Sequence, residues 1–147
     1  MVFALEEARA AIAHGDVPVG AVVMSAGPEL EVLARRHNER ELTGDPTAHA
    51  EILALRDAAK RFGSWHLEGC TLVVTLEPCP MCAGALVAAR VDRIVFGAPD
   101  PRAGACGSLY NIAADPRLNH ELEVVSGLWA EQSGALLQGF FEERRRS

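Results

Sequence analysis

The sequence contains no apolar run that approaches the ~20 residues needed to cross a membrane as a helix. Its N-terminus also lacks a basic segment followed by an apolar one, which is the pattern of a secretory signal. Internal repeats and low-complexity segments are absent too, so nothing indicates a repeat architecture. We therefore expect a protein that does not enter the membrane and that works in the cytoplasm.

Positive charge is also scarce. The chain has 14 Lys and Arg against 20 Asp and Glu, which gives a formal net charge of −6 at pH 7. Proteins that bind nucleic acid usually show a basic surface. The overall charge therefore argues weakly against a nucleic-acid substrate, although it does not exclude a local basic patch.

The composition is otherwise that of an ordinary globular protein. The 147 residues are 49% hydrophobic and 23% charged, which is enough for one domain, residues 1–147, with a full hydrophobic core. There are only four cysteines, and two of them have the spacing of metal ligands. Without an export signal, this usage favours a reducing compartment.

Two short segments carry the chemical information, namely His49-Ala50-Glu51 and Pro78-Cys79-Pro80-Met81-Cys82. One imidazole and two thiolates would give Zn²⁺ three protein ligands, from His49, Cys79 and Cys82, and leave a fourth position open for water. Glu51 is not needed as a ligand and is free to carry protons. A metal that generates a nucleophile beside a proton carrier is typical of a hydrolytic site.

Other interpretations of these residues remain open. The Cys-x-x-Cys pair alone is compatible with a redox motif, but such a pair would not require a His-x-Glu at matching distance. A structural zinc site would be closed by a fourth protein ligand, for which Cys70 and Cys106 are available. Glu51 alone could be a solvated acid in the first turn of a helix, where the helix dipole favours it.

The order of the predicted elements indicates an α/β protein. Hydrophobic periodicity and turn residues predict helices over 2–14, 48–62, 80–90 and 128–141, and strands over 18–24, 30–34, 71–76, 93–97 and 121–125. Strands that alternate with helices imply a sheet covered by helices on both faces, and the initial hairpin makes this sheet mixed. On the helix over 48–62 we expect the buried face to contain Ile52, Leu55, Ala59 and Phe62.

This arrangement would bring the two motifs together. His49 and Glu51 would lie in the first turn of one helix, and Cys79 and Cys82 at the start of another. Two helix N-termini directed at one ion would favour negative charge and help the cysteines to remain thiolates. Because the helix over 80–90 is apolar nearly all round, it must be deeply buried or part of an interface, and we expect a homodimer.

The motifs lie within a longer resemblance. The sequence resembles bacterial tRNA-specific adenosine deaminases of the cytidine deaminase-like superfamily over nearly its whole length. The segments that carry it are Val17–Ala21, Asn38, Asp45–Glu51, Thr75–Ala85, Val95–Ala98, Asp100 and Gly104–Ser108. The zinc signature is specific only to the superfamily, and Asp45–Glu51 also resembles guanine deaminases. The later segments and the Phe-Phe near the C-terminus indicate the tRNA-editing branch.

The resemblance implies a three-layer α/β/α cytidine deaminase-like fold with a five-stranded mixed sheet, and a homodimer. It also implies hydrolytic deamination of adenosine to inosine at the wobble position of a tRNA anticodon loop. By position, Asn38 would hydrogen-bond the flipped base, Val19 would pack on it, and Asp100 would contact the backbone near the target nucleotide. Asn38 could instead be a turn or cap residue, and Asp100 a plain turn acid.

Two rival functions remain at this point. One is a small-molecule deaminase acting on guanine, cytosine or a nucleoside, and the other is a non-catalytic zinc-stabilised interaction domain, which would have no use for Glu51. An RNA substrate would require a local basic patch. Its candidate members are Lys60, Arg61, Arg102, Arg117, Arg144, Arg145 and Arg146.

Overall fold

The computed structural model describes residues 1–146 as a sheet of five strands with helices on both faces. The helices are α1 (Val2–Ile12), α2 (Arg40–Thr43), α3 (Ala50–Phe62), α4 (Pro80–Ala88) and α5 (Ala130–Arg146). The strands are β1 (Gly20–Ser25), β2 (Glu31–His37), β3 (Thr71–Leu76), β4 (Arg93–Ala98) and β5 (Glu123–Ser126).

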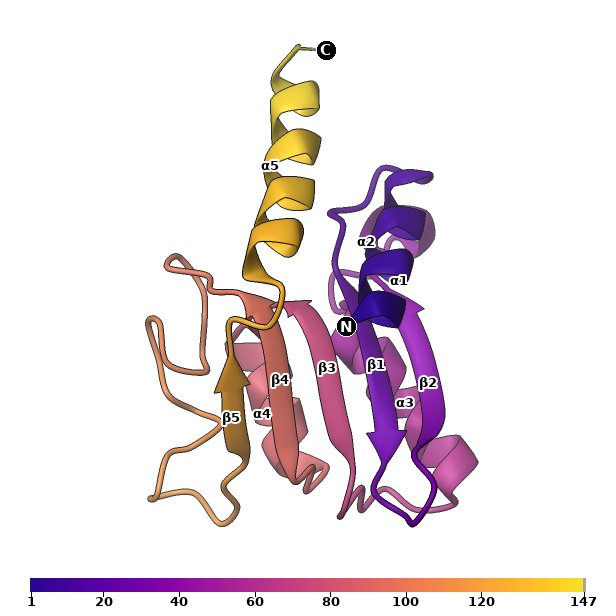
Figure 1. Cartoon of the computed structure of the whole chain (residues 1–147), viewed down its shortest axis with the longest axis vertical. Helices are drawn as coiled ribbons and strands as arrows, with labels where there is room; N and C mark the ends of the chain where they lie inside the picture. The colour runs from indigo at the N-terminus through magenta and orange to yellow at the C-terminus, as the bar shows by residue number, and fades with distance from the viewer. Residues whose placement is uncertain (147) are drawn as a thin grey trace.

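The sheet has the strand order β2-β1-β3-β4-β5. β1 is antiparallel to β2 and β3, whereas β3, β4 and β5 are parallel. α3 and α4 cover one face, and α1 and α5 lie on the other, with the C-terminal half of α5 extending beyond the sheet (Figure 1). The three-layer arrangement and the mixed five-stranded sheet are thereby confirmed.

The larger part of the core lies between the sheet and the layer of α3 and α4. There Leu72 and Val74 of β3 pack with Ala54 and Ala58 of α3 and with Leu86 of α4. β3 is the central strand and is rich in β-branched residues, which suit a pleated surface buried on both sides. On the other face, a smaller cluster joins Ala4 of α1 to Val22 and Val73.

Gly20 explains how closely α1 approaches the sheet. A Cβ atom at this position would lie 1.9 Å from the carbonyl oxygen of Ala4 and 2.6 Å from the backbone nitrogen of Ala8. Only glycine lets the helix backbone come so near to a strand. Because of this contact, α1 lies directly over the start of β1.

Several boundaries differ from those predicted. β2 extends to His37, and α5 begins at Ala130, after Gly127 and Trp129 have adopted positive φ, and continues to Arg146. α2 was not predicted, because a four-residue helix has no apolar periodicity and its first turn is fixed by hydrogen bonds to the distant side chain of Asp16.

The buried face of α3 is rotated from the one expected. Leu55 is buried and Ala59 partly buried, but Phe62 is 43% exposed, and the sheet is contacted instead by Ala54 and Ala58. Small side chains allow the helix to approach the sheet closely, so they rather than the larger residues define the buried face. Within residues 1–146, no helix is both long and apolar enough to cross a membrane.

The topology defines where a site can form. β3 and β4 are parallel neighbours that end side by side, with Leu76 paired to Ala98. The segments that follow them, which begin at Glu77 and Pro99, therefore meet at one edge of the sheet. In open α/β sheets this carboxyl edge is where ligands bind.

Candidate active site

Three potential metal ligands meet at this edge. His49 directly precedes α3, Cys79 directly precedes α4, and Cys82 lies in the first turn of α4. The Nδ1 atom of His49 lies 3.7 Å from Sγ of Cys79 and 3.4 Å from Sγ of Cys82, and the three ligand atoms lie within 4.8 Å of one another. The N-termini of two helices thus place one imidazole and two thiols around a single point.

This geometry fits a zinc ion. With Zn–S and Zn–N bonds of about 2.3 and 2.05 Å, tetrahedral coordination separates nitrogen and sulfur ligands by about 3.6 Å. The two sulfur to nitrogen distances, 3.7 and 3.4 Å, lie on either side of this value. Within residues 1–146, neither Cys70 nor Cys106 belongs to the cluster, so the described ligand set has three members.

The electrostatics of the two sulfurs also suit a cation. Hydrogen bonds from the Cys82 thiol and from His49 lower the pKa of Cys79 to about 4. The pKa of Cys82, in contrast, is raised by its hydrogen bond to Cys79 and by burial. One thiolate thus forms readily, and the second is disfavoured beside it. A cation at the centre of the cluster would hold both sulfurs in the charged form.

Glu51 lies beside this cluster and is shielded from solvent. Its side chain is only 4% exposed, and burial raises the pKa of its carboxyl. The Cys82 thiol is within hydrogen-bonding reach of the carboxylate. Glu51 is therefore not a solvated acid of the first helical turn. A buried carboxyl with a raised pKa, next to a candidate metal site, has the properties of a group that accepts and releases protons.

A pocket of about 290 Å³ opens onto the cluster. Its walls combine His49, Cys79 and Glu51 with apolar and polar groups from four other segments. They include Val17, Val19, Asn38, Arg40, Leu76, Glu77, Asp100 and Ala103. All three residues expected to contact substrate, Val19, Asn38 and Asp100, thus line the same pocket as His49, Glu51 and Cys79.

Asn38 forms two hydrogen bonds within the protein. Its Nδ2 donates to the carbonyl of Val17 at 3.0 Å, and its Oδ1 accepts from the backbone N–H of Ala50 at 2.8 Å. The side chain therefore supports the first turn of α3, next to His49. One N–H and one oxygen lone pair of the amide are left for a ligand in the pocket.

Asp100 combines a turn role with its position in the pocket wall. Its Oδ1 accepts hydrogen bonds from the backbone N–H groups of Arg102 at 3.0 Å and Ala103 at 3.2 Å. This pattern stabilises the turn after β4. The side chain is nevertheless half-buried and lines the pocket.

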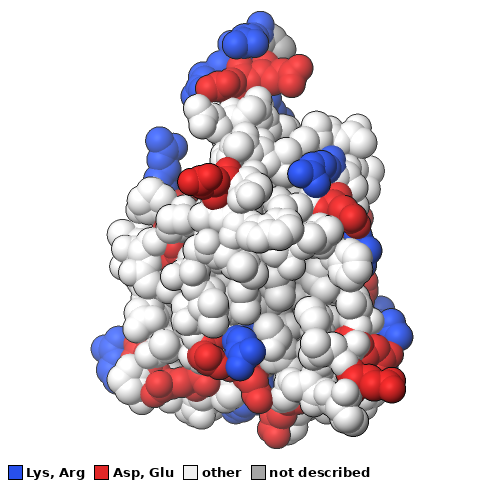
Figure 2. Space-filling view, viewed as in Figure 1, with Lys and Arg blue, Asp and Glu red and all other residues white. Residues whose placement is uncertain are grey.

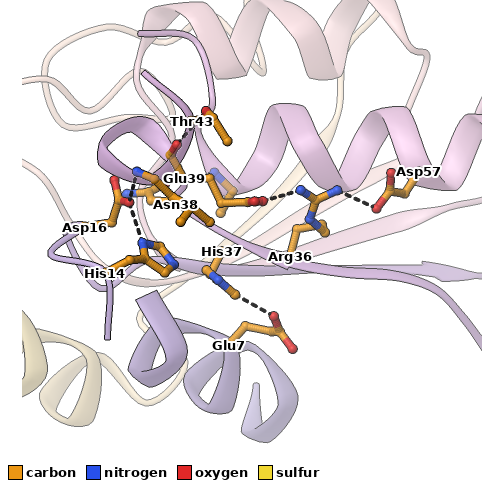
Figure 3. Close-up of polar contacts among 11 residues, drawn as sticks. Glu7, His14, Asp16, Arg36, His37, Asn38, Glu39, Thr43 and Asp57 are labelled. Carbon is orange, nitrogen blue, oxygen red and sulfur yellow. Dashed lines mark hydrogen bonds and ion pairs between the residues drawn. The ribbon is translucent and has the colours of Figure 1, made fainter. Parts of the chain in front are cut away.

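A polar network supports the segment between β2 and α3 (Figure 3). Asp16 is buried and accepts hydrogen bonds from the backbone N–H groups of Glu41 and Leu42, which fixes the start of α2, and it also contacts His14. Burial raises the pKa of Asp16, but these bonds outweigh it and hold that pKa below its ordinary 3.8.

Arg36 completes the network around α2. Its guanidinium forms ion pairs with Glu39, which precedes α2, and with Asp57 of α3 (Figure 3). α2 is thereby held beside α3. Arg40, the first residue of α2, lines the pocket and has no ion pair within residues 1–146. Arg40 was not predicted as a site residue, since nothing in the neighbouring sequence distinguishes it from a solvated arginine.

A larger groove of about 680 Å³ shares Val17, Leu76 and Asp100 with the pocket. It extends along α5, where Leu137, Gln138 and Phe141 line it together with the candidate basic residues Arg102, Arg144 and Arg145. Figure 2 shows that the tip of α5 carries both basic and acidic side chains.

The remaining candidates for a basic patch are not part of this groove. Arg117 is paired with Asp115, and Arg61, near the end of α3, is paired with Glu31. Lys60 precedes Arg61 on the same exposed end of the helix and does not line the groove either. Of the basic residues proposed from the sequence, Arg102, Arg144 and Arg145 are therefore the ones that the structure brings to the groove.

Glu77 was also missed as an individual residue, although it lies inside the motif that contains Cys79. Its carboxylate is 2% exposed and is surrounded by hydrogen-bond donors from the segment after β4. Burial raises its pKa, but these hydrogen bonds lower the pKa of the carboxyl below its ordinary value. The sequence signal that could have identified Glu77 is a single acidic residue directly after the apolar strand β3.

Comparison with known proteins identifies a family of deaminases. A family model described as MafB19-like deaminase matches residues 1–145. A tRNA-specific adenosine deaminase of Bacillus subtilis is 50% identical over 143 residues, which cover 97% of this chain and 87% of the relative.

Solved structures give the same result. One structure comes from a study of A-to-I editing by tRNA:A34 deaminases at the wobble position of transfer RNA. It superposes with a TM-score of 0.87 at 42% sequence identity, and the match covers 93% of this chain and 97% of the other. Guanine deaminase from Nitrosomonas europaea follows with a TM-score of 0.77 at 28% identity, covering 95% and 81%. By this identity over nearly the full length of both chains, the protein belongs to the tRNA-specific adenosine deaminase family.

Proposed function

We propose that this protein is a zinc-dependent hydrolase that deaminates adenosine to inosine at the wobble position of a tRNA anticodon. The observation that carries the proposal is the buried Glu51 carboxyl, which lines a pocket beside the cluster of His49, Cys79 and Cys82. The similarity to curated tRNA-specific adenosine deaminases supports the choice of substrate.

His49, Cys79 and Cys82 would hold the metal ion. When bound, zinc supplies Lewis acidity that lowers the pKa of a coordinated water. Glu51 would accept a proton from the attacking water and deliver it to N1 of the adenine ring. It would then help to protonate the departing amino group, so that water and adenosine yield inosine and ammonia. A proton carrier of this kind contributes typically ~10²–10⁴-fold to the rate.

The target base must leave its stack to reach this pocket. A nucleotide in a single-stranded loop can be extruded at lower cost than a paired one. We propose that Asn38 uses its remaining N–H and lone pair to hydrogen-bond the base, and that Val19 packs against it. Asp100 would contact the backbone near the target nucleotide.

The phosphate backbone would be held by cations of the pocket and of the groove connected to it. Arg40 lines the pocket, and Arg102, Arg144 and Arg145 line the groove. Because the net charge of the chain is −6, this local arrangement has to supply the electrostatic attraction. All four cysteines are free, which is consistent with the reducing cytoplasm that we propose as the location.

The test of this function is a direct comparison of substrates. Purified zinc-loaded protein is incubated with total bacterial tRNA, and separately with free guanine, cytosine and adenosine. Inosine in tRNA is detected by sequencing as an A-to-G change, and ammonia release reports on the free compounds. We expect inosine at the wobble position only. Turnover of guanine without any change in tRNA would assign the protein to the guanine deaminases that it also resembles in structure.

We also propose a homodimer, through the outer faces of α3 and α4. The outward face of α4 carries small or apolar side chains, including Met81, which is 38% exposed. Beside it, an apolar groove of about 320 Å³ is lined by Ile52, Leu55, Arg56, Ala59, Trp65, Leu67, Ala85, Ala88 and Ala89. An apolar surface of this kind favours association with a second copy.

Light scattering tests the dimer directly. At micromolar concentration we expect twice the 15.7 kDa mass of the chain. Trp65→Glu, which places a charge in the groove, should shift the mass toward that of the monomer, whereas Leu30→Glu, at an exposed position outside the groove, should not. A monomeric parent protein would refute the dimer.

A further inference from the structure

Glu77 is a buried carboxylate to which the proposed chemistry gives no task. It is the first residue after β3 and precedes the metal-ligand candidate Cys79 by two positions. Its side chain is almost completely excluded from water. A buried charge is costly unless it is well solvated by the protein, so the groups around this carboxylate should reveal what it does.

Within residues 1–146, all hydrogen-bond donors to the Glu77 carboxylate come from one segment, residues 100–108. Oε1 accepts from the backbone N–H of Asp100 at 3.0 Å and from the hydroxyl of Ser108. Oε2 accepts from the backbone N–H groups of Cys106 at 3.0 Å and Ser108 at 3.1 Å. A carboxylate has about four acceptor sites, and here this one segment fills them.

Backbone contacts extend the connection on both sides of Glu77. Its own N–H donates to the carbonyl of Ala98 at 2.9 Å, and the N–H of Ala105 donates to the carbonyl of Pro78 at 2.8 Å. At Gly104 a Cβ atom would lie 2.4 Å from Oε2 of Glu77. Only a glycine lets the segment lie so close to the carboxylate.

The same segment forms a wall of the pocket. Asp100 and Ala103 line it together with Val19, Asn38 and Cys79. We propose that Glu77 is a positioning residue. Its carboxylate fixes residues 100–108 relative to the start of α4, where the metal-ligand candidates Cys79 and Cys82 lie. A flipped base is thereby held between a fixed wall and the reacting centre. This inference rests on the proposed deamination.

The expected consequence is a change in kcat rather than in RNA affinity. Three of the four arginines proposed to bind phosphate, Arg40, Arg144 and Arg145, lie outside residues 100–108, so most of the affinity for RNA would not depend on this wall. Glu77→Gln replaces one acceptor oxygen by an NH₂ group that faces N–H donors, so part of the segment is released. Because misplacement of a reacting group by about 1 Å can cost roughly 10²-fold, we expect kcat on an anticodon stem-loop to fall by about that factor. KM should change little.

Amide hydrogen exchange tests the same idea without any reaction. In Glu77→Gln, the N–H groups of Asp100, Cys106 and Ser108 should exchange faster than in the parent, while bound zinc stays at the parental amount. Ser108→Ala removes one donor but leaves the carboxylate with its three N–H partners, and it should have a much smaller effect on kcat.

A matched control separates positioning from loss of stability. Val73→Ala creates a small cavity in the cluster beneath α1, on the opposite face of the sheet, and should lower Tm without lowering kcat. If Glu77→Gln does not fold, Gly104→Ala serves instead. It keeps the carboxylate but pushes the segment away, and the same loss of kcat is expected.

Two results would overturn the inference. One is parental amide exchange together with parental kcat in the Glu77 variant. The other is loss of zinc from that variant, which would make Glu77 a support of the ligands rather than of the pocket wall. Since exchange and zinc content are measured without substrate, they stand even if the parent protein proves inactive on tRNA, a result that would refute only the proposed function.

Discussion

Replacing Glu51 by glutamine would separate proton transfer from every other property of the site. The amide has nearly the same shape as the carboxylate but cannot carry a proton between water and the base. His49, Cys79 and Cys82 are left unchanged, so binding of one zinc ion per chain should persist. The variant therefore removes the proposed proton carrier from an otherwise complete site.

The magnitude follows from the role and from the surroundings of the side chain. Loss of a general acid–base group costs typically ~10²–10⁴-fold, or about 2.7–5.5 kcal/mol in the activation barrier. Glu51 is only 4% exposed, so bulk water is poorly placed to take over the transfer at the same position. We therefore expect a loss near the upper end of this range. A neutral amide avoids the cost of burying a charge, so Tm should not fall.

The assay is a single-turnover measurement with excess protein on an anticodon stem-loop, in which inosine is quantified by mass spectrometry. Zinc content and Tm are measured on the same preparations. Glu131→Gln, at an exposed acidic position in the first turn of α5, is the matched control and should keep the parental rate. A Glu51 variant within a few-fold of the parental rate would refute the proton-carrier role.

The other predictions concern RNA binding and stability. Arg40→Ala should weaken RNA binding and make the plot of log binding constant against log salt concentration less steep by about 0.7, whereas Arg117→Ala should do neither. Equal slopes for the two variants would show that Arg40 does not contact the RNA backbone. Deletion of Arg144–Arg146 should slow tRNA editing and make the salt dependence of binding less steep than in the parent protein. An unchanged rate and an unchanged slope would show that these three residues do not bind RNA. Asp16→Asn should cost about 1–3 kcal/mol at pH 7. Because folding lowers the pKa of Asp16, its contribution is complete above its ordinary pKa of 3.8 and is lost as the pH falls through the folded value. The difference in urea unfolding should therefore narrow at pH 3, and a constant difference would contradict this account.

Much of the fold could be predicted because local patterns agreed with the tertiary context. The β-branched run of β3 and the proline at the start of α4 lie where the sequence placed them. The prediction failed where long-range contacts decide the outcome. α2 depends on Asp16, 25 residues before Glu41, and the face of α3 depends on how closely Ala54 and Ala58 let the helix approach the sheet.

The candidate site, like the fold, contains residues that local sequence patterns predicted and residues that they did not. The spacing of His49, Cys79 and Cys82 is local information, and the structure brings these side chains together. Arg40 and Glu77 could not be singled out, because their importance depends on what surrounds them. Arg40 is distinguished by having no ion pair within residues 1–146. Glu77 is distinguished by its hydrogen-bond donors, which lie more than twenty residues away in the sequence.

The most direct test of the central claim is X-ray absorption at the zinc edge of the purified protein. Three side chains are proposed to hold one zinc ion with a position left open, as hydrolysis requires. We expect two sulfur scatterers at about 2.3 Å and two lighter scatterers, nitrogen or oxygen, at about 2.0–2.1 Å. Three or four sulfur scatterers would mean that Cys70 or Cys106 closes the site, and would contradict a catalytic metal centre.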